Sequence, residues 1–391
     1  MTGYATSRPL PREQRLDVVA FLRRLDRQLL LAVGALVAYG LWAVAGITRY
    51  DVEGDESYYV VRQAIAAGLG FVGFLVALTV DPDRLRRAQR PLYALTIALM
   101  LLVFPLAEST RGSKRWIELG PFQFQPSEFG KLLCVLALAG FLADRMRRLR
   151  EPRVVRQAVG LASVPILLVF KQPDLGTALV YTAAFAACLF VAGVRWGHLL
   201  GLAVLGATVV ASIVWFLPSA GVEVLEPYQI ERLTGFADRD KDLAGINFNV
   251  NQSITAVGAG GLNGRGVDAA TQTRLSFLPE HATDFVFASF AEQRGFVGAA
   301  LLLGLYLLVV WRALRVITVA RDAFGAIVAG GIVLAFLFQV FVNVGMTMGI
   351  APVTGIPLPF VTVGGSSMVA NLLAIGLLQS IHARGSLGRG R

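Results

Sequence analysis

Ten long apolar runs constrain what this chain can fold into. A helix needs about 20 apolar residues to cross the hydrocarbon core of a bilayer. Only 16% of the 391 residues are charged, whereas soluble domains carry about 25%. The sequence therefore predicts an all-α polytopic membrane protein, a bundle of about ten transmembrane helices. The predicted spans are residues 28–48, 60–80, 88–107, 127–143, 156–171, 174–194, 197–217, 284–311, 322–349 and 365–382.

The basic residues between the spans predict their orientation. With ten spans, every arginine-rich loop falls on the side of the N-terminus, and the first opposite loop, Asp51 to Glu56, is acidic. Because short cytoplasmic loops are enriched in Lys and Arg, we expect both termini in the cytoplasm. The large loop between spans 7 and 8, residues 218–283, then faces outward. The clustered basic residues include Arg84, Arg86, Arg87, Arg90, Arg145, Arg147, Arg148, Arg150, Arg153, Arg156, Arg312, Arg315, Arg321 and Arg384.

The two ends flank a single predicted membrane domain, residues 28–382. Residues 1–27 form a cytoplasmic segment in which arginines alternate with apolar residues. This pattern is typical of an amphipathic helix on the inner membrane surface, and a basic tail is the alternative interpretation. Residues 383–391 are expected to form a cytoplasmic C-terminal tail.

Several functional classes are excluded by the sequence. The net charge of +10 reflects loop topology, so it does not indicate a nucleic-acid partner. The two cysteines, Cys134 and Cys188, lie inside apolar runs and lack metal-site spacing, as small buried hydrophobes do. The glycine run 258–266 departs from the pattern Gly-x-Gly-x-x-Gly and follows no strand, so it is not a nucleotide-binding loop. Its glycines instead favour tight turns and close backbone approach.

Four polar segments share the outer face: residues 108–131, 171–176, 218–284 and 350–366. The last contains three prolines, which forbid a continuous helix. The amide and carbonyl groups of a non-helical backbone at membrane depth need hydrogen-bond partners, which come from the protein or from a water-filled cavity.

Charged groups at the ends of spans are functional candidates. Glu128 and Lys131 lie three residues apart at a helix start and share one face, so an ion pair is the structural alternative to a role in substrate binding. For Asp174 the alternative is a helix N-cap. Further candidate substrate-binding residues of these segments are Lys114, Arg115, Gln172, Arg232, Gln252, Ser253 and Arg265.

Asp284 is the candidate catalytic residue. It opens an apolar span, where an N-cap or first-turn position is the structural alternative. The long polar loop before it and the cations on the same face favour a reactive carboxylate. Such cations suit a diphosphate or another anionic head group. The sequence therefore predicts either chemistry on, or transport of, a lipid-linked substrate at the outer surface.

Four motifs carry a resemblance to a known family. They cover nearly all of residues 28–382, and together they resemble the SEDS family (shape, elongation, division and sporulation), which includes RodA and FtsW. The motifs are Gly112–Ile117 with Gln125–Lys131; Gln172–Ala178; Gln252–Ser253, Gly260–Leu262, Gly264–Gly266, Phe277–Glu280 and Thr283–Phe285; and Asn343, Gly345–Met346, Pro352–Phe360 and Gly364–Ser367.

The resemblance implies a ten-helix fold and a function. A member of this family is expected to be a peptidoglycan glycosyltransferase of the bacterial plasma membrane that polymerises lipid II into glycan strands. Its expected partners are a class B penicillin-binding protein and other membrane proteins of the elongation complex. Gln272 and residues 276–280 look more like RodA than FtsW, which implies a role in cell shape and elongation.

The resemblance also implies the roles of individual residues. Asp284 would act as general base, and cations would stabilise the diphosphate leaving group. Glu280, Thr283 and Ser366 lie in the motifs and join the candidate substrate-binding residues. No cofactor is certain; a divalent cation, Mg²⁺ or Mn²⁺, is left open. The chain departs from the family at Ala282, where relatives usually have histidine, and its His281 stands one position earlier.

Two other functions remain open alternatives. A lipid II flippase would also need a many-helix bundle with a polar cavity, but with polar groups facing both leaflets. A non-catalytic scaffold of the elongation machinery would tolerate substitution of Asp284 and Arg115.

Overall fold

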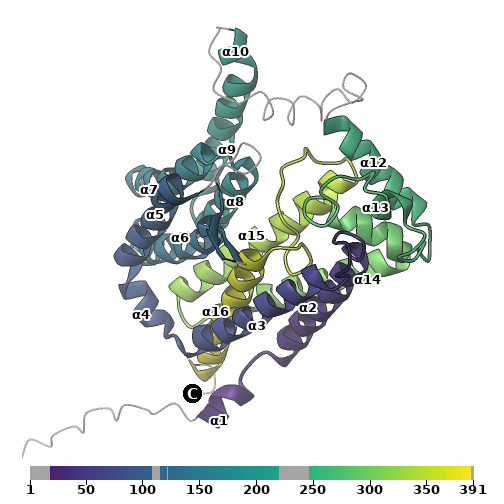
Figure 1. Ribbon diagram of the computed structural model, residues 1–391. Coiled ribbons are helices and arrows are strands. Elements are labelled where there is room, and N and C mark those ends of the chain that lie inside the picture. The colour runs from purple at the N-terminus through teal and green to yellow at the C-terminus, as the bar shows by residue number, and fades with distance from the viewer. Residues whose placement is uncertain (1–17, 108–114, 121, 220–245, 389–391) are drawn as a thin grey trace, which may run out of the picture.

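Helices dominate the computed structural model, which describes residues 18–107, 115–120, 122–219 and 246–388 (Figure 1). Eight helices in these ranges are long and apolar enough to cross a membrane, and two shorter apolar helices accompany them. These ten match the ten predicted spans, so the predicted fold class is confirmed. They are α2 (Arg27–Ile47), α3 (Tyr58–Thr79), α5 (Gln89–Leu106), α6 (Pro126–Ala143), α7 (Pro152–Lys171), α8 (Leu175–Val191), α9 (Trp196–Ala211), α14 (Val286–Val319), α15 (Ala323–Thr347) and α16 (Gly365–Gly388).

Short elements lie before the first span and between the spans. One of them is a hairpin of two antiparallel strands, which the sequence did not lead us to expect. Its register pairs Ile117 with Phe124 and Leu119 with Phe122. The short elements are α1 (Val18–Arg23), α4 (Pro82–Arg87), β1 (Ile117–Leu119), β2 (Phe122–Phe124), η1 (Met146–Arg148), η2 (Ser212–Phe216), α10 (Leu217–Ser219), α12 (Ile246–Ala259) and α13 (Thr271–Arg274).

Helix boundaries differ from the prediction mainly at the C-terminal ends of α14 and α16. α14 runs to Val319, well past the predicted residue 311, and α16 continues to Gly388 through most of the expected tail. Residues 312–319 combine two arginines, Arg312 and Arg315, with aliphatic residues and one threonine, and the helix continues through them. Apolar length alone marks where the membrane ends, not where a helix ends.

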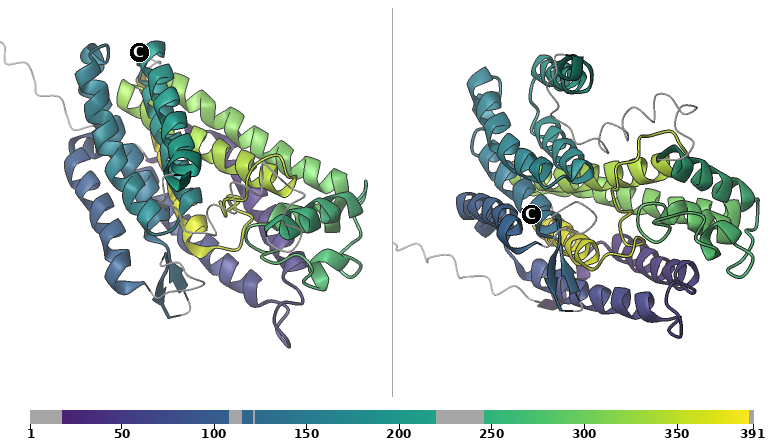
Figure 2. Two further views of the ribbon diagram at one scale, coloured as in Figure 1. Left: turned by 90° about the horizontal axis from the view of Figure 1, so that it is seen from above. Right: turned by 45° about the horizontal axis from the view of Figure 1, so that its top comes forward.

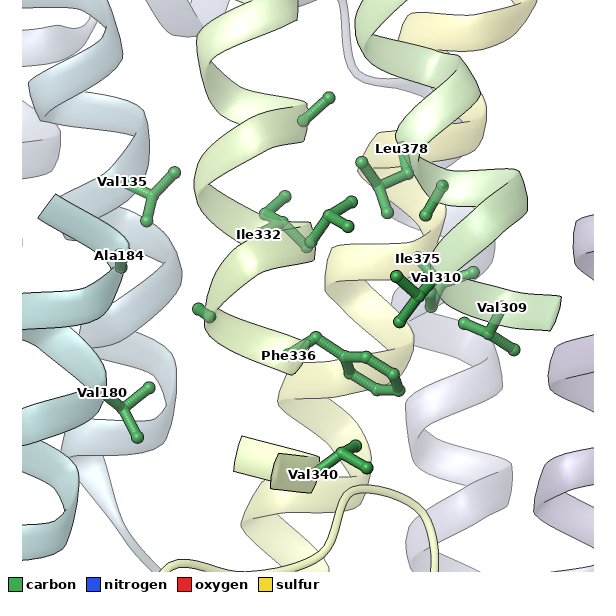
Figure 3. Packing of buried hydrophobic residues seen from close by; sticks show 14 of the residues in the cluster. Val135, Val180, Ala184, Val309, Val310, Ile332, Phe336, Val340, Ile375 and Leu378 are labelled. Carbon is green, nitrogen blue, oxygen red and sulfur yellow. The ribbon is translucent and has the colours of Figure 1, made fainter. Parts of the chain in front are cut away.

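A central helix, α15, organises the core. Its residues Ile332 and Phe336 pack with Val135 of α6, Val310 of α14 and Ile375 of α16 in one buried cluster (Figure 3). By contrast, none of the described residues of α9 is buried, and Figures 1 and 2 show α9 and α10 extending away from the other helices.

Small residues bring α3 and α16 into close contact. A Cβ atom added at Gly376 would lie 2.6 Å from the carbonyl oxygen of Phe74, and one added at Gly70 would lie 2.6 Å from the Leu372 side chain. Such small residues let membrane helices approach closely. The contact holds α16, whose first turn contains Ser366, against α3.

A kink in α14 receives the glycine-rich loop. Gly295 has a φ of 65° inside this helix, and the amides of Phe296 and Val297 donate to the carbonyls of Gly261 (2.8 Å) and Leu262 (3.1 Å). A Cβ atom added at Gly264 would collide with the backbone of the kinked helix. The interpretation of these glycines as sites of close backbone approach is therefore confirmed.

Candidate active site

Asp284 stands in a tight turn immediately before α14. The turn is closed by Thr283, whose Oγ1 donates to Glu280 Oε2 at 2.9 Å, and by the Phe285 amide, which donates to the Glu280 carbonyl at 3.1 Å. Phe285 occupies the N-cap position of α14, so the interpretation of Asp284 as the N-cap is not supported. Asp284 itself is half-buried.

The turn is joined to the proline-rich segment that precedes α16. The Val363 amide donates to the Ala282 carbonyl (3.2 Å), and Thr362 Oγ1 donates to the Thr283 carbonyl (3.3 Å). The proline-rich segment is non-helical, as its prolines predicted. Protein groups satisfy much of its buried backbone, among them the Gln63 side chain, which bonds Thr362 O and the Gly364 amide.

Both segments contain strained backbone. Glu280 has a φ of 53° and Phe360 a φ of 67°, a left-handed conformation that costs a non-glycine residue roughly 1–3 kcal/mol. Such strain persists only where the surroundings hold it, and it clusters at functional sites. Here the two strained residues lie in the two segments that meet beside Asp284.

A buried stripe on α15 links the parts of the site. Gln339, Asn343 and Thr347 follow one another at intervals of four residues, so they share one face of the helix, and all three are buried. Asn343 Nδ2 donates to the carbonyls of both Asp284 (3.1 Å) and Ile356 (2.8 Å). Gln339 and Thr347 were not predicted as site residues. The sequence feature that could have identified them is the occurrence of polar residues every four positions inside an apolar span.

Glu128 and Lys131 form a buried pair near the start of α6. Lys131 Nζ lies 3.1 Å from Glu128 Oε2 and 3.4 Å from Gln339 Oε1. The residues are only 1% and 8% exposed, so the predicted ion pair is confirmed. The pair lines a cavity of about 40 Å³ that is otherwise mostly apolar. Because Gln339 lies one helical turn from Asn343, the pair is connected through α15 to the backbone of Asp284.

A second polar cluster surrounds Asp174. Its carboxylate accepts from the Thr177 amide (3.0 Å) and hydroxyl (2.8 Å), so the N-cap interpretation is confirmed. The same carboxylate accepts from Gln125 Nε2 at 3.3 Å and lies 3.7 Å from Arg115 Nη1. Arg115 also donates to the Pro173 carbonyl (2.5 Å).

Ser366 brings this second cluster close to the Asp284 turn. Its Oγ accepts from the Gln125 amide (2.9 Å) and donates to the Gln123 carbonyl (2.9 Å). Ser366 lies only four residues after Thr362, which contacts the Asp284 turn, and four residues span at most about 14 Å. The segment 362–366 therefore connects the two clusters.

Other predicted site residues make contacts that hold the fold together. Gln172 and Ser253 are buried, and Arg265 is exposed on the glycine-rich loop. Their contacts give no support to the predicted role in substrate binding. Gln252 is half-buried on α12, and Lys114 and Arg232 lie outside the described residues. The hydrogen bonds of the first three residues are those from Gln172 Nε2 to Met100 O (2.8 Å), from Ser253 Oγ to Thr347 O (2.7 Å) and from Arg265 Nε to Ala259 O (3.1 Å).

Two further carboxylates support the site without having been predicted. Glu292 of α14 is 0% exposed and accepts from the Gln272 amide (2.9 Å) and the Thr273 hydroxyl (2.8 Å). It thereby anchors the short helix α13. Asp51, in the loop between α2 and α3, lies 2.9 Å from His281 Nε2, which ties that loop to the Asp284 turn. Long-range pairs of this kind leave no local signal in a sequence.

Metal binding has no dedicated ligand set in the described ranges. Among those residues, no three His, Cys, Asp or Glu side chains gather closely enough to hold an ion. The involvement of a divalent cation, Mg²⁺ or Mn²⁺, stays open, as it was from the sequence.

Comparison with known proteins gives a consistent result. The family model for FtsW, RodA and SpoVE, described as "Cell cycle protein", matches residues 25–386. Peptidoglycan glycosyltransferase MrdB of Escherichia coli (strain K12) is 35% identical over 361 residues, 92% of this chain and 93% of that protein. Stage V sporulation protein E of Bacillus subtilis (strain 168) is 35% identical over 356 residues, 90% and 94% of the two chains.

Solved structures share the fold. A chain from a structure described as "Structural coordination of polymerization and crosslinking by a peptidoglycan synthase complex" has a TM-score of 0.78 and 31% identity, covering 92% of this chain and 98% of that one. The crystal structure of the rod shape determining protein RodA of Thermus thermophilus has a TM-score of 0.67 and 28% identity, covering 92% and 96%.

Proposed function

The chain belongs to the FtsW, RodA and SpoVE family of cell cycle proteins, and from this membership we propose that it is a peptidoglycan glycosyltransferase that polymerises lipid II into glycan strands. It is an integral membrane protein. Two relatives named peptidoglycan glycosyltransferase, MrdB and a probable FtsW of Trichlorobacter lovleyi, are 35% and 34% identical over more than nine-tenths of this chain. We further propose the RodA branch and a role in elongation, on the residues 272 and 276–280.

The proposed orientation places Asp284 on the outer face. Salt bridges between arginine and aspartate connect the basic loops at one end of the bundle. There Arg86 lies 2.9 Å from Asp144, and Arg312 lies 2.6 Å from Asp26. By the positive-inside rule this end is cytoplasmic, together with both termini. Asp284 precedes α14, and Arg312 lies near the other end of that helix. The carboxylate therefore faces outward.

In the proposed reaction, Asp284 takes the proton from the acceptor's sugar hydroxyl. The hydroxyl oxygen forms a bond to the anomeric carbon of the donor, and the bond from that carbon to the lipid diphosphate breaks. A single displacement of this kind needs a base on the face opposite the leaving group. Cationic side chains of the outer face, Arg115 and Lys114 among them, would neutralise the diphosphate.

The observation that carries this assignment is how the Asp284 turn is held. Hydrogen bonds fix the backbone of Ala282, Thr283 and Asp284 to the proline-rich segment and to Asn343, while the side chain of Asp284 stays half-exposed. A backbone held in this way is what a positioned general base requires.

The proposed partners follow from the chemistry. A glycan polymerase needs a crosslinking enzyme, and we propose a class B penicillin-binding protein together with other membrane proteins of the elongation complex. The similar chain described as part of a peptidoglycan synthase complex supports this proposal.

Polymerisation of purified lipid II by Asp284→Ala and Asp284→Asn tests the function. Loss of a general base lowers the rate about 10²–10⁴-fold, and raising the pH should not restore it in either variant. Asp268→Asn, the same change at an exposed outer carboxylate bonded to Tyr50, serves as control and should keep the wild-type rate. Wild-type polymerisation by Asp284→Ala would refute the base assignment. Translocation of lipid II in vesicles, lost with Asp284→Ala, would instead indicate a flippase.

A further inference from the structure

A second cavity lies between α5, α6 and α7, at the end of the bundle opposite Asp284. Its volume is about 290 Å³, far more than the roughly 30 Å³ that one water occupies in the liquid. Nothing in the proposed glycosyl transfer uses it. Its lining residues are Gln89, Arg90, Tyr93, Ala137, Leu138, Phe141, Asp144, Arg145 and Leu161.

A proline shapes the wall of this cavity. Pro165 lies inside α7, and because proline has no amide hydrogen, the carbonyl four residues earlier loses its helical partner. That carbonyl belongs to Leu161, and the Tyr93 hydroxyl donates to it at 3.0 Å. Leu161 lies nine residues into α7, about 14 Å along its axis. The cavity therefore reaches from the helix ends well into the depth of the apolar layer.

The charge at the mouth is positive. Asp144 is already neutralised by Arg86 Nη2 at 2.9 Å and bonded by Gln89 Nε2 at 2.5 Å. Burial alone would raise the pKa of the Asp144 carboxyl, but the hydrogen bonds from Gln89 and Arg86 outweigh it and hold that pKa below its ordinary value. The Asp144 carboxylate is thus already paired with Arg86 and Gln89 of the protein itself.

Two arginines at the mouth form no salt bridge within the described residues, although the nearby charge of Arg145 also helps to lower the pKa of Asp144. Within the described residues, Arg90 makes no ion pair or hydrogen bond and is exposed. Arg145 donates only to the Phe141 carbonyl (3.2 Å), and its guanidinium lies 4.0 Å from the centre of the Phe141 ring. Both guanidinium groups are therefore available to an anion at the point where helix ends meet the membrane surface.

We propose that this cavity binds an anionic phospholipid of the cytoplasmic leaflet, a leaflet that follows from the orientation proposed above. Arg90 and Arg145 bind the phosphate, and one acyl chain lies against Ala137, Leu138 and Leu161. Basic pockets between membrane helices on the cytoplasmic side suit such head groups. A free phosphate would satisfy the arginines but leave the apolar wall uncovered, whereas a phospholipid covers both.

Displacement of a fluorescent phosphatidylglycerol from the purified full-length protein tests the proposal. Unlabelled phosphatidylglycerol should compete, whereas phosphatidylcholine and chain-free glycerol phosphate should compete at least tenfold less well. In Arg90→Gln/Arg145→Gln, affinity for phosphatidylglycerol should fall about 30-fold, since each basic residue near an anionic surface contributes about 1 kcal/mol and 1.4 kcal/mol is tenfold. Arg90→Lys/Arg145→Lys should retain most of the binding.

The matched control is Arg147→Gln/Arg150→Gln, which removes the same amount of charge from exposed positions in the loop that also holds Arg145. An equal loss of affinity in this control would show a diffuse charge effect and overturn the proposal. So would equal competition by phosphatidylcholine or by glycerol phosphate. The readout is lipid binding, so failure here leaves the assignment of glycosyl transfer untouched, and an inactive Asp284→Ala variant should bind the lipid normally.

Discussion

Replacing Asn343 with leucine tests how the catalytic turn is positioned. This buried amide donates to the carbonyls of Asp284 and Ile356, so it joins the turn before α14 to the proline-rich segment. Leucine keeps the approximate volume and the apolar surroundings but cannot donate. The change therefore removes the link while leaving the Asp284 carboxylate in place.

The expected loss of stability is moderate. The carbonyls of Asp284 and Ile356 lose this donor, and a buried acceptor left unsatisfied costs about 1–3 kcal/mol. Against this loss, Asn343 Oδ1 is buried without a partner in the described residues, and removing such an atom recovers about 1–3 kcal/mol. The free energy of unfolding should therefore fall by about 1–3 kcal/mol.

The expected loss of activity is large. A displacement of about 1 Å at a catalytic group costs about 100-fold in rate. We expect kcat for lipid II polymerisation to fall by about that factor, with KM nearly unchanged because the substrate contacts remain. The assay follows glycan chain formation by the purified variant at several lipid II concentrations.

Gln379→Leu is the matched control. Gln379 is also a buried amide with two backbone hydrogen bonds, to the amide and the carbonyl of Asp26, each 2.9 Å long. It lies on α16 beyond the Asp284 region, near the opposite end of the bundle. Its replacement should cost at least as much stability as Asn343→Leu, but leave kcat near wild type. Equal kcat losses in the two variants, or full activity in Asn343→Leu, would refute the positioning role.

Two further predictions concern stability. Glu128→Gln should lower the free energy of unfolding by about 3–5 kcal/mol, because it strands the buried charge of Lys131; Glu128→Gln/Lys131→Met should recover most of that loss in a thermal unfolding assay. Gly264→Ala should destabilise the protein strongly, since its φ is 81° and a Cβ would collide with Gln293. Gly258→Ala, with open space around it, should be neutral in the same assay, and a loss there equal to that of Gly264→Ala would contradict the reasoning.

Local chemistry made several features of the site predictable. The N-cap role of Asp174 and the ion pair of Glu128 with Lys131 involve residues three positions apart, so helix geometry alone brings them together. The non-helical proline-rich segment followed from the geometry of proline. The glycine-rich loop was predicted as a place of close approach, although its partner, the kink of α14, was not.

Other features depended on pairs distant in the chain. His281 and Asp51 are 230 positions apart, and Asn343 and Asp284 are 59 apart. The Asp284 N-cap interpretation failed because α14 begins later than its apolar run suggested. The β-hairpin was missed because its strands are only three residues long, too short to show an alternating pattern.

The sequence by itself determined the number of apolar helices, their order and the positions of the polar segments, because hydrophobic length and loop charge are properties of contiguous residues. It also identified Asp284 as the candidate base. Only the tertiary structure decided which polar side chains meet: the rotation and packing of α15 bring Gln339 to Lys131 and Asn343 to the backbone of Asp284. The polar loop before α14 becomes a candidate active site because that packing holds its backbone in place.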